Sequence, residues 1–244
     1  MGERLPVGLL KFFERDDYID SLLGGTVFFA APETYRADGH EGRGDPQESC
    51  AAAYRMQAGD LPLQMKFGDQ EFQVTALTVH SAGRKQGWLH CWFAIELPTD
   101  FEELERLIED INRMRDQFGS RYVFLHAERI DNFVDRVRGS LPSEPKDGID
   151  HGLVNYSARQ DEFGVFCKAH HYAYQREYRF VLGECGHIET TAKQVRCPGG
   201  FKDILFLEPT IRILGQSEKE LLLVLDKDGC RMMLNDLPEE ATEI

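Results

Sequence analysis

Three polar side chains recur at alternate positions in a segment whose other residues favour a β-strand. The segment AYQREYRFVLGE runs from residue 173 to 184 and carries Gln175, Glu177 and Arg179. Side chains of an extended chain alternate between two faces, so the three are predicted to share one face. Such a row could stabilise positive charge that develops in a transition state. It could equally pair with neighbouring strands on a solvated face of an antiparallel sheet.

Two further groups of polar residues could take part in chemistry. Lys11 lies in the apolar run LLKFF, directly before a predicted helix. The second group occupies residues 32–49, a polar, glycine-rich stretch long enough to predict a functional or disordered loop. A solvated turn region is the alternative for this loop. Its candidate side chains are Tyr35, Arg36, Arg43, Asp45 and Glu48.

Short motifs of high specificity are missing from the sequence. There is no phosphate-binding loop, no H-E-x-x-H pattern and no nucleophile elbow. The adjacent His170 and His171 are predicted to face opposite sides of a strand, one in solvent and one in the core. No metal site is predicted. A metal-dependent hydrolase or nuclease that binds Mg²⁺ through Asp45, Glu48 and Glu177 remains an alternative.

Composition narrows the functional classes. The formal net charge of −14 over 244 residues argues against general nucleic-acid binding, although two or three arginines suffice for a small anionic ligand. No apolar run is long enough to span a bilayer, and the N-terminus lacks the pattern of a signal peptide. The six cysteines include no C-x-x-C pair and are expected to be reduced. We therefore expect a cytoplasmic protein without a membrane partner.

Hydrophobic periodicity predicts an α+β fold with mixed or antiparallel sheets. About three helices are expected, at residues 15–25, 100–119 and 127–139. About eight to ten strands are expected, among them 8–13, 26–31, 72–81, 87–97, 121–126, 153–158, 163–173, 177–183, 203–215 and 220–229. The whole chain, 1–244, is predicted to form a single domain. A weak internal boundary falls near 140–152, where proline, glycine and charged residues gather.

The order of these pieces resembles a large, poorly characterised bacterial family. Its members have an aromatic-Lys-aromatic strand, an N-D-P-F-E motif, a C-F-S-like strand and a late K…Y-x-x-E-x-R strand. The counterparts in this chain are LLKFF (9–13), RGDPQES (43–49), LHCWFAI (89–95) and VFCKAHHYAYQREYRFVL (165–182). Lys168, Tyr174, Glu177 and Arg179 match the last motif. Gly44 stands where the family has asparagine, and the family's Met-Trp-x-x-Tyr segment is not clear. This resemblance implies no activity.

The sequence is also similar, more distantly, to ADP-ribosyltransferases. In that family a basic residue on the first strand contacts NAD, a tyrosine or serine follows the second strand, and a catalytic glutamate begins a late strand. Lys11, Tyr35 and Glu177 stand in this order, and Gln175-Arg176-Glu177 resembles the family's Q-x-E pattern. The resemblance implies an ADP-ribosyltransferase-like fold, with NAD as the substrate.

The same resemblance implies roles for individual residues. Glu177 would stabilise the oxocarbenium charge that develops as the nicotinamide–ribose bond breaks, and Gln175 would position the acceptor. Tyr35 would stack on nicotinamide. Arg179 would keep Glu177 ionised. Residues expected to bind the substrate are Lys11, Arg43, Asp45, Glu48, Lys168 and Arg179, with Arg43 or Lys11 at the pyrophosphate.

Two functional hypotheses therefore stand at this point, besides the metal-dependent alternative. The first is a bacterial or phage enzyme that cleaves NAD or transfers ADP-ribose, with a small nucleotide substrate and, for the transfer, a protein acceptor. The second is a non-catalytic module whose acidic surface mimics nucleic acid or docks a basic partner. In the second hypothesis the polar residues around Glu177 form only a structural network.

Overall fold

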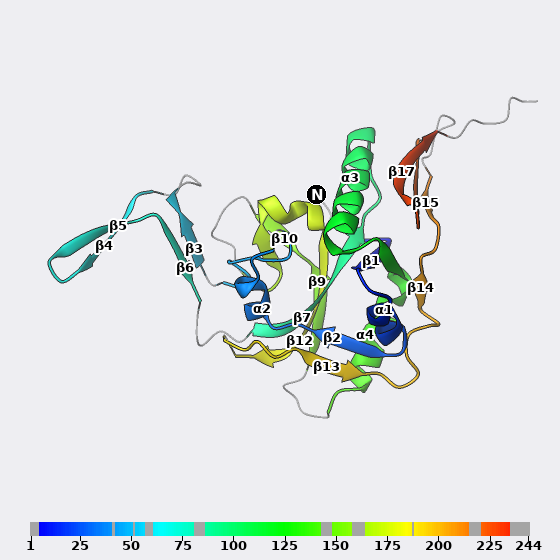
Figure 1. The fold of residues 1–244 in the computed structure, drawn as a ribbon, viewed down its shortest axis with the longest axis horizontal. Coiled ribbons are helices and arrows are strands. Elements are labelled where there is room, and N and C mark those ends of the chain that lie inside the picture. Colours follow the sequence, from blue (N-terminus) through cyan, green and yellow to red (C-terminus); the bar gives the residue numbers. More distant parts are fainter. Residues whose placement is uncertain are drawn as a thin grey trace, which may run out of the picture. The chain divides into compact units, whose positions relative to one another are not determined.

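The computed structural model, drawn in Figure 1, describes most of the chain. Its residues form two compact units. The first comprises Met1–Thr26, Trp92–Asp135 and Pro198–Ile244, and the second Val27–Cys91 and Arg136–Cys197. The described residues are 5–40, 42–50, 52–56, 61–80, 86–142, 148–157, 164–186, 188–214 and 221–234. Residues 143–147 of the predicted boundary, and end residues of several predicted strands, lie outside them. The chain passes between the two units after residues 26, 91, 135 and 197, none of which lies within that boundary. A single domain stays a prediction.

The α+β class is confirmed. The described residues form four α-helices and two short 3-10 helices, together with mostly antiparallel sheets. The helices are α1 (Asp16–Leu23), α2 (Pro32–Ala37), α3 (Phe101–Phe118), η2 (Ala127–Arg129), α4 (Ile130–Gly139) and η3 (His170–Gln175). No helix among the described residues has the length and apolar character needed to cross a membrane.

Both predicted element counts are too low. The described residues contain strands β1 to β17, and α2 forms inside the stretch expected to be a loop. Pro32 begins α2, and its fixed φ suits the first helical turn. The single strand predicted at 72–81 is divided at Thr75 into β5 (Gln70–Val74) and β6 (Ala76–Val79). Such short elements depend on tertiary contacts, which hydrophobic periodicity does not reveal.

The first unit is built on an antiparallel sheet whose strands follow the order β14-β8-β1-β7. The strands are β1 (Gly8–Phe13), β7 (Gln86–Ile95), β8 (Arg121–His126) and β14 (Leu205–Leu207). Only the part of β7 from Trp92 onward belongs to the first unit. Helix α3 packs on β1 through a buried stripe of Leu104, Leu107, Ile111 and Met114. Its boundaries follow the predicted signals, because Asp100 accepts a 2.8 Å hydrogen bond from the Glu103 N–H and Gly119 ends the helix.

A three-stranded sheet packs against the same helix. Its strands are β15 (Ile211–Ile213), β16 (Leu221–Asp226) and β17 (Gly229–Leu234). Arg115 is buried and donates hydrogen bonds of 2.8 Å to the carbonyls of Asp226 and Lys227. Asn112 exchanges hydrogen bonds with the backbone of Cys230. These two side chains of α3 therefore fasten the β16–β17 turn to the helix.

The second unit places β12 beside β7 and β9 in the order β7-β12-β9. Its other strand pairs are β2 with β13, parallel β10 with β11, β3 with β6, and β4 with β5. The strands not yet given are β2 (Thr26–Phe29), β3 (Ala52–Arg55), β4 (Leu63–Phe67), β9 (Ile149–Leu153), β10 (Asn155–Ser157), β11 (Cys167–Ala169), β12 (Glu177–Cys185) and β13 (Lys193–Arg196). The first six residues of β12 are all buried, so neither of its faces is solvated there.

Candidate functional site

The polar row predicted around Glu177 begins before the strand does. Residues 170–175 form η3, and Arg176 then adopts left-handed backbone angles of φ 39° and ψ 48°. Strand β12 starts only at Glu177, so the strand predicted for residues 173–184 was wrong at residues 173–176. Gln175 nevertheless converges with Glu177, because Lys168 Nζ donates to Gln175 Oε1 and to Glu177 Oε1, each at 2.6 Å. A turn brings these two acceptors together, whereas strand alternation was expected to do so.

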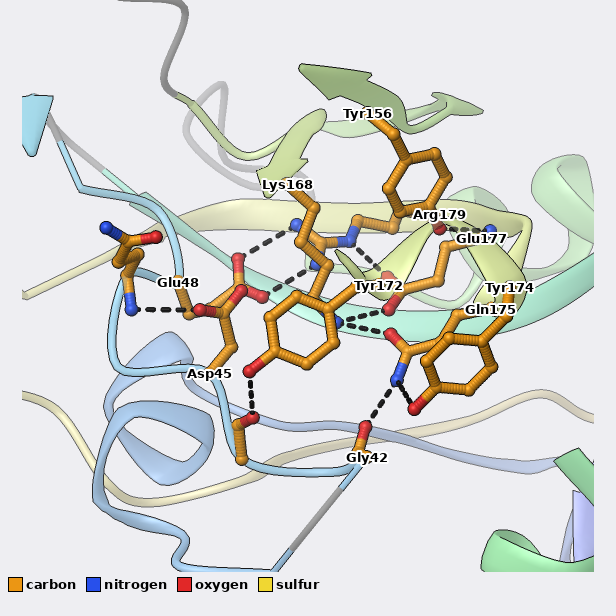
Figure 2. A network of polar contacts seen from close by, with 12 residues as sticks. Gly42, Asp45, Glu48, Tyr156, Lys168, Tyr172, Tyr174, Gln175, Glu177 and Arg179 are labelled. Carbon is orange, nitrogen blue, oxygen red and sulfur yellow. Dashed lines mark hydrogen bonds and ion pairs between the residues drawn. The ribbon is translucent and has the colours of Figure 1, made fainter. Parts of the chain in front are cut away.

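Glu177 is a buried carboxylate held between two cations (Figure 2). Its Oε1 accepts from Lys168 at 2.6 Å and its Oε2 accepts from the Arg179 Nε at 2.7 Å. Burial alone would raise the pKa of Glu177, but Arg179 and Lys168 outweigh this effect and lower it to about 2. The alternative that placed Glu177 and Arg179 on a solvated face is therefore wrong, because only 7% of Glu177 and 1% of Arg179 are exposed.

Arg179 links this strand to the loop that carries the D-P-x-E motif. Its Nη1 and Nη2 donate to the two carboxylate oxygens of Glu48 at 2.8 and 2.7 Å, and Nη1 also donates to the Val165 carbonyl at 2.5 Å. With Nε on Glu177, every guanidinium nitrogen has an acceptor. The two motifs of the resembled bacterial family thus meet in one ion-paired network.

The loop reaches this position through its own local hydrogen bonds. Asp45 Oδ1 accepts from the Gln47 N–H at 2.9 Å, which forms an Asx turn, and the Tyr35 carbonyl accepts from the Asp45 N–H at 2.9 Å. Arg36 donates to the Glu48 carbonyl at 2.8 Å. A Cβ on Gly44 would overlap the carbonyl oxygen of Asp38. The loop therefore requires glycine where the resembled family has asparagine.

Asp45 is a second buried carboxylate, and its pKa is shifted in the opposite direction to that of Glu177. Only 2% of the residue is exposed. Burial, followed by the charge of Glu48, raises its pKa to about 6, although Lys168 acts in the other direction. Glu177 is thus ionised at neutral pH, while Asp45 can gain or lose a proton at a pH close to neutral. Two carboxylates whose pKa values are pushed apart are typical of acid–base sites.

Tyrosines surround the network, and sequence reasoning missed most of them. Tyr172 donates to the Gly44 carbonyl at 2.7 Å, and its ring lies 4.6 Å from Lys168 Nζ. The Glu177 N–H donates to the Tyr156 hydroxyl at 2.7 Å, and Gln175 Nε2 donates to the Tyr174 hydroxyl at 3.2 Å. Figure 2 shows these rings around the charged side chains. Tyr174 alone carried a sequence signal, as part of the late motif.

Tyr35 belongs to the same region. Burial, followed by the charges of Cys91, Glu177 and Glu48, raises the pKa of its phenol well above the usual value. The negative charges of Glu177 and Glu48 therefore act on this phenol. The predicted contact of Tyr35 with a nicotinamide ring stays a prediction.

Two of the predicted binding residues have other contacts. Arg43 is half-exposed, pairs with Asp38 through Nε and lies 3.2 Å from the His40 Nδ1. Lys11 belongs to the first unit, where its Nζ lies 5.9 Å from the centroid of the Trp92 ring. The residues that the structure brings together, all in the second unit, are Tyr35, Asp45, Glu48, Lys168, Gln175, Glu177 and Arg179.

The histidines, cysteines and carboxylates of the described residues do not form a metal site. Across the described residues, no three or more His, Cys, Asp or Glu side chains are grouped to hold a metal ion. His170 and His171 are both exposed on η3, so the predicted core histidine was wrong. All six cysteines are free thiols, four of them buried.

No protein-family model, curated protein or solved structure matches the chain.

Proposed function

We propose that the chain cleaves the nicotinamide–ribose bond of NAD and transfers the ADP-ribosyl group to water or to an acceptor, with an ADP-ribosyltransferase-like fold. One observation carries this proposal. Glu177, the first residue of the late strand β12, is an ionised carboxylate fixed by Lys168 and Arg179 and preceded by Gln175. The resemblance to ADP-ribosyltransferases assigns the catalytic glutamate to this place.

The chemistry requires a fixed negative charge and a group that takes up a proton. Nicotinamide leaves NAD as a neutral molecule, so cleavage needs no acid but leaves an oxocarbenium ion on the ribose. Glu177 stabilises this ion because its carboxylate is already ionised and oriented. When the oxygen of water or of an acceptor bonds to the ribose carbon, that oxygen loses a proton. Asp45, with a pKa of about 6, accepts it.

The remaining residues bind and orient the substrate in this proposal. Tyr35 stacks on nicotinamide, and Gln175 positions the acceptor. Lys168 and Arg179 hold Glu177 in place and keep it ionised. The half-exposed guanidinium of Arg43 meets the pyrophosphate.

The proposal is tested by measuring nicotinamide release from NAD, with and without added protein acceptors. The wild type is expected to release nicotinamide, and Glu177→Gln is expected to lower the rate by about a hundredfold to a thousandfold. Glu184 is an exposed glutamate on the same strand, so Glu184→Gln serves as the matched control with an unchanged rate. A wild-type protein that releases no nicotinamide under any of these conditions would exclude the proposal.

A specific observation favours a second candidate, the non-catalytic acidic module. Both carboxylate oxygens of Glu177 are already bound by cations, and the network satisfies its own charges without a ligand. Glu177→Gln is expected to lower stability by about 1–3 kcal/mol under either function, because it weakens a buried ion pair. Stability therefore does not separate the candidates. Nicotinamide release by the wild type does, since the module releases none.

A further inference from the structure

The hairpin of β4 and β5 has one apolar and one polar face. Cross-strand partners lie on the same face of a sheet, so the register assigns each side chain to a face. One face is formed by the pairs Leu63–Val74 and Met65–Phe72 and by Phe67 opposite Gln70. The other is formed by the pairs Gln64–Gln73 and Lys66–Glu71. We call Leu63, Met65, Phe67, Phe72 and Val74 the apolar hairpin face.

This face is open to solvent where its aromatic residues lie. Phe67 is 63% exposed and Phe72 is 48% exposed, and their rings meet edge to face with centroids 6.0 Å apart. Within the described residues, β4 and β5 form a sheet of only two strands. A two-stranded hairpin is marginally stable by itself in water. Clustered exposed aromatics on such a hairpin mark a contact surface.

The charge distribution points to the occupant. Residues 61–80 hold one basic residue, Lys66, and two acidic residues, Asp69 and Glu71, so +1 and −2 give −1 of the chain's −14. The apolar hairpin face itself contains no ionisable side chain. Two copies of so acidic a chain repel each other over most of their surfaces, and this repulsion is small at the hairpin. The face is also its own complement, as a two-fold contact between identical chains requires.

We propose that the apolar hairpin face binds the same face of a second copy of this chain about a two-fold axis. The contact buries Phe67 and Phe72 of each copy between two hairpins, with the polar faces outward. Five residues from each copy are far fewer than the roughly 20–30 a side of a stable interface, so this contact is a weak one. The dimer is therefore reversible and forms with rising protein concentration. This proposal does not depend on any catalytic activity.

Sedimentation velocity over a range of micromolar concentrations tests the proposal. The wild type is expected to shift from monomer to dimer, and Phe67→Ser with Phe72→Ser is expected to weaken association at least tenfold. The control is Gln64→Ser with Gln73→Ser, which changes the opposite face of the same hairpin and leaves association unchanged. Equal weakening by both double variants would overturn the proposal, because hairpin stability rather than the apolar face would then control association.

A second pair of variants identifies the occupant independently. Phe72→Glu and Phe72→Lys place like charges against each other in a two-fold contact, so each variant alone is expected to stay monomeric. An equimolar mixture is expected to associate again, because the opposite charges then face each other. A wild type that stays monomeric at every concentration would show that something other than a second copy covers this face. That result, or a mixture that fails to associate while the wild type dimerises, would overturn the proposal.

Discussion

Arg115 and Arg179 are both buried arginines, one in each unit, and their guanidinium groups have different hydrogen-bond partners. Arg115 donates to two backbone carbonyls at the β16–β17 turn. Arg179 pairs with the carboxylates of Glu48 and Glu177, and Glu177 also binds Lys168. In the first unit, backbone carbonyls alone accept these hydrogen bonds from the buried guanidinium. The second unit gathers four charged groups, with Asp45 beside them.

This difference separates a structural arginine from one in a candidate site. Buried ion pairs add little net stability compared with apolar packing, because the desolvation of each charge opposes the attraction between them. Strongly shifted pKa values, in contrast, gather at functional sites. Glu177 has a pKa of about 2 and Asp45 one of about 6 within the same network. The second unit is therefore the place to look for chemistry, whereas Arg115 fastens two elements of the fold.

The largest expected effect comes from removing Arg179. Arg179→Met leaves the carboxylates of Glu48 and Glu177 buried without their shared cation, so we expect the free energy of unfolding to fall by about 3–5 kcal/mol. Urea denaturation measures this loss. Adding Glu48→Gln to Arg179→Met should recover part of it, because one of the two uncompensated charges is then removed. A loss below about 1 kcal/mol would show that the network is solvated and that the contrast with Arg115 is false.

Arg115→Met is expected to have an intermediate effect. The variant removes two hydrogen bonds from a charged donor to carbonyls but leaves no buried carboxylate unpaired, so a loss of about 2 kcal/mol is expected. Nicotinamide release, where the wild type shows it, should be unchanged in the folded variant. A selective loss of activity without a loss of stability would contradict the structural role given to Arg115.

Asp45→Asn is expected to have almost no effect on stability near pH 4 and to raise the stability as the pH increases. The folded-state pKa of Asp45 is raised from 3.8 to about 6, so the folded protein binds the proton more tightly than the unfolded chain. The wild type consequently loses stability as the pH rises from about 4 to about 6, and the asparagine variant does not. Above pH 6 the variant should be more stable than the wild type by about 3 kcal/mol, since a pKa shift of one unit corresponds to about 1.4 kcal/mol. Denaturation at pH 4 and pH 8 measures the difference, and an equal difference at both would refute the raised pKa.

Local signals in the sequence were sufficient for some elements. The apolar run 8–13 became β1 with the predicted bounds, and the helix predicted at 100–119 became α3, Phe101–Phe118. Both depend on periodicity and on capping residues adjacent in sequence. The stretch 170–176 failed, because its residue types favour a strand while the structure makes a 3-10 helix and a left-handed turn there. Contacts of Gln175 and Tyr172 with the loop at 42–44 lie far away in sequence and gave no local signal.

The sequence by itself predicted most of the charged residues of the candidate site, since the D-P-x-E and late motifs contain Asp45, Glu48, Lys168, Glu177 and Arg179. It could not determine that Glu48 and Arg179, 131 positions apart, form a bidentate ion pair. It also could not determine that this pair is buried. Pairing and burial depend on how a loop closes over a strand, and that closure sets the dielectric surroundings and pKa of each carboxylate. Only the tertiary structure therefore decided that Glu177 is held ionised while the pKa of Asp45 is raised to about 6.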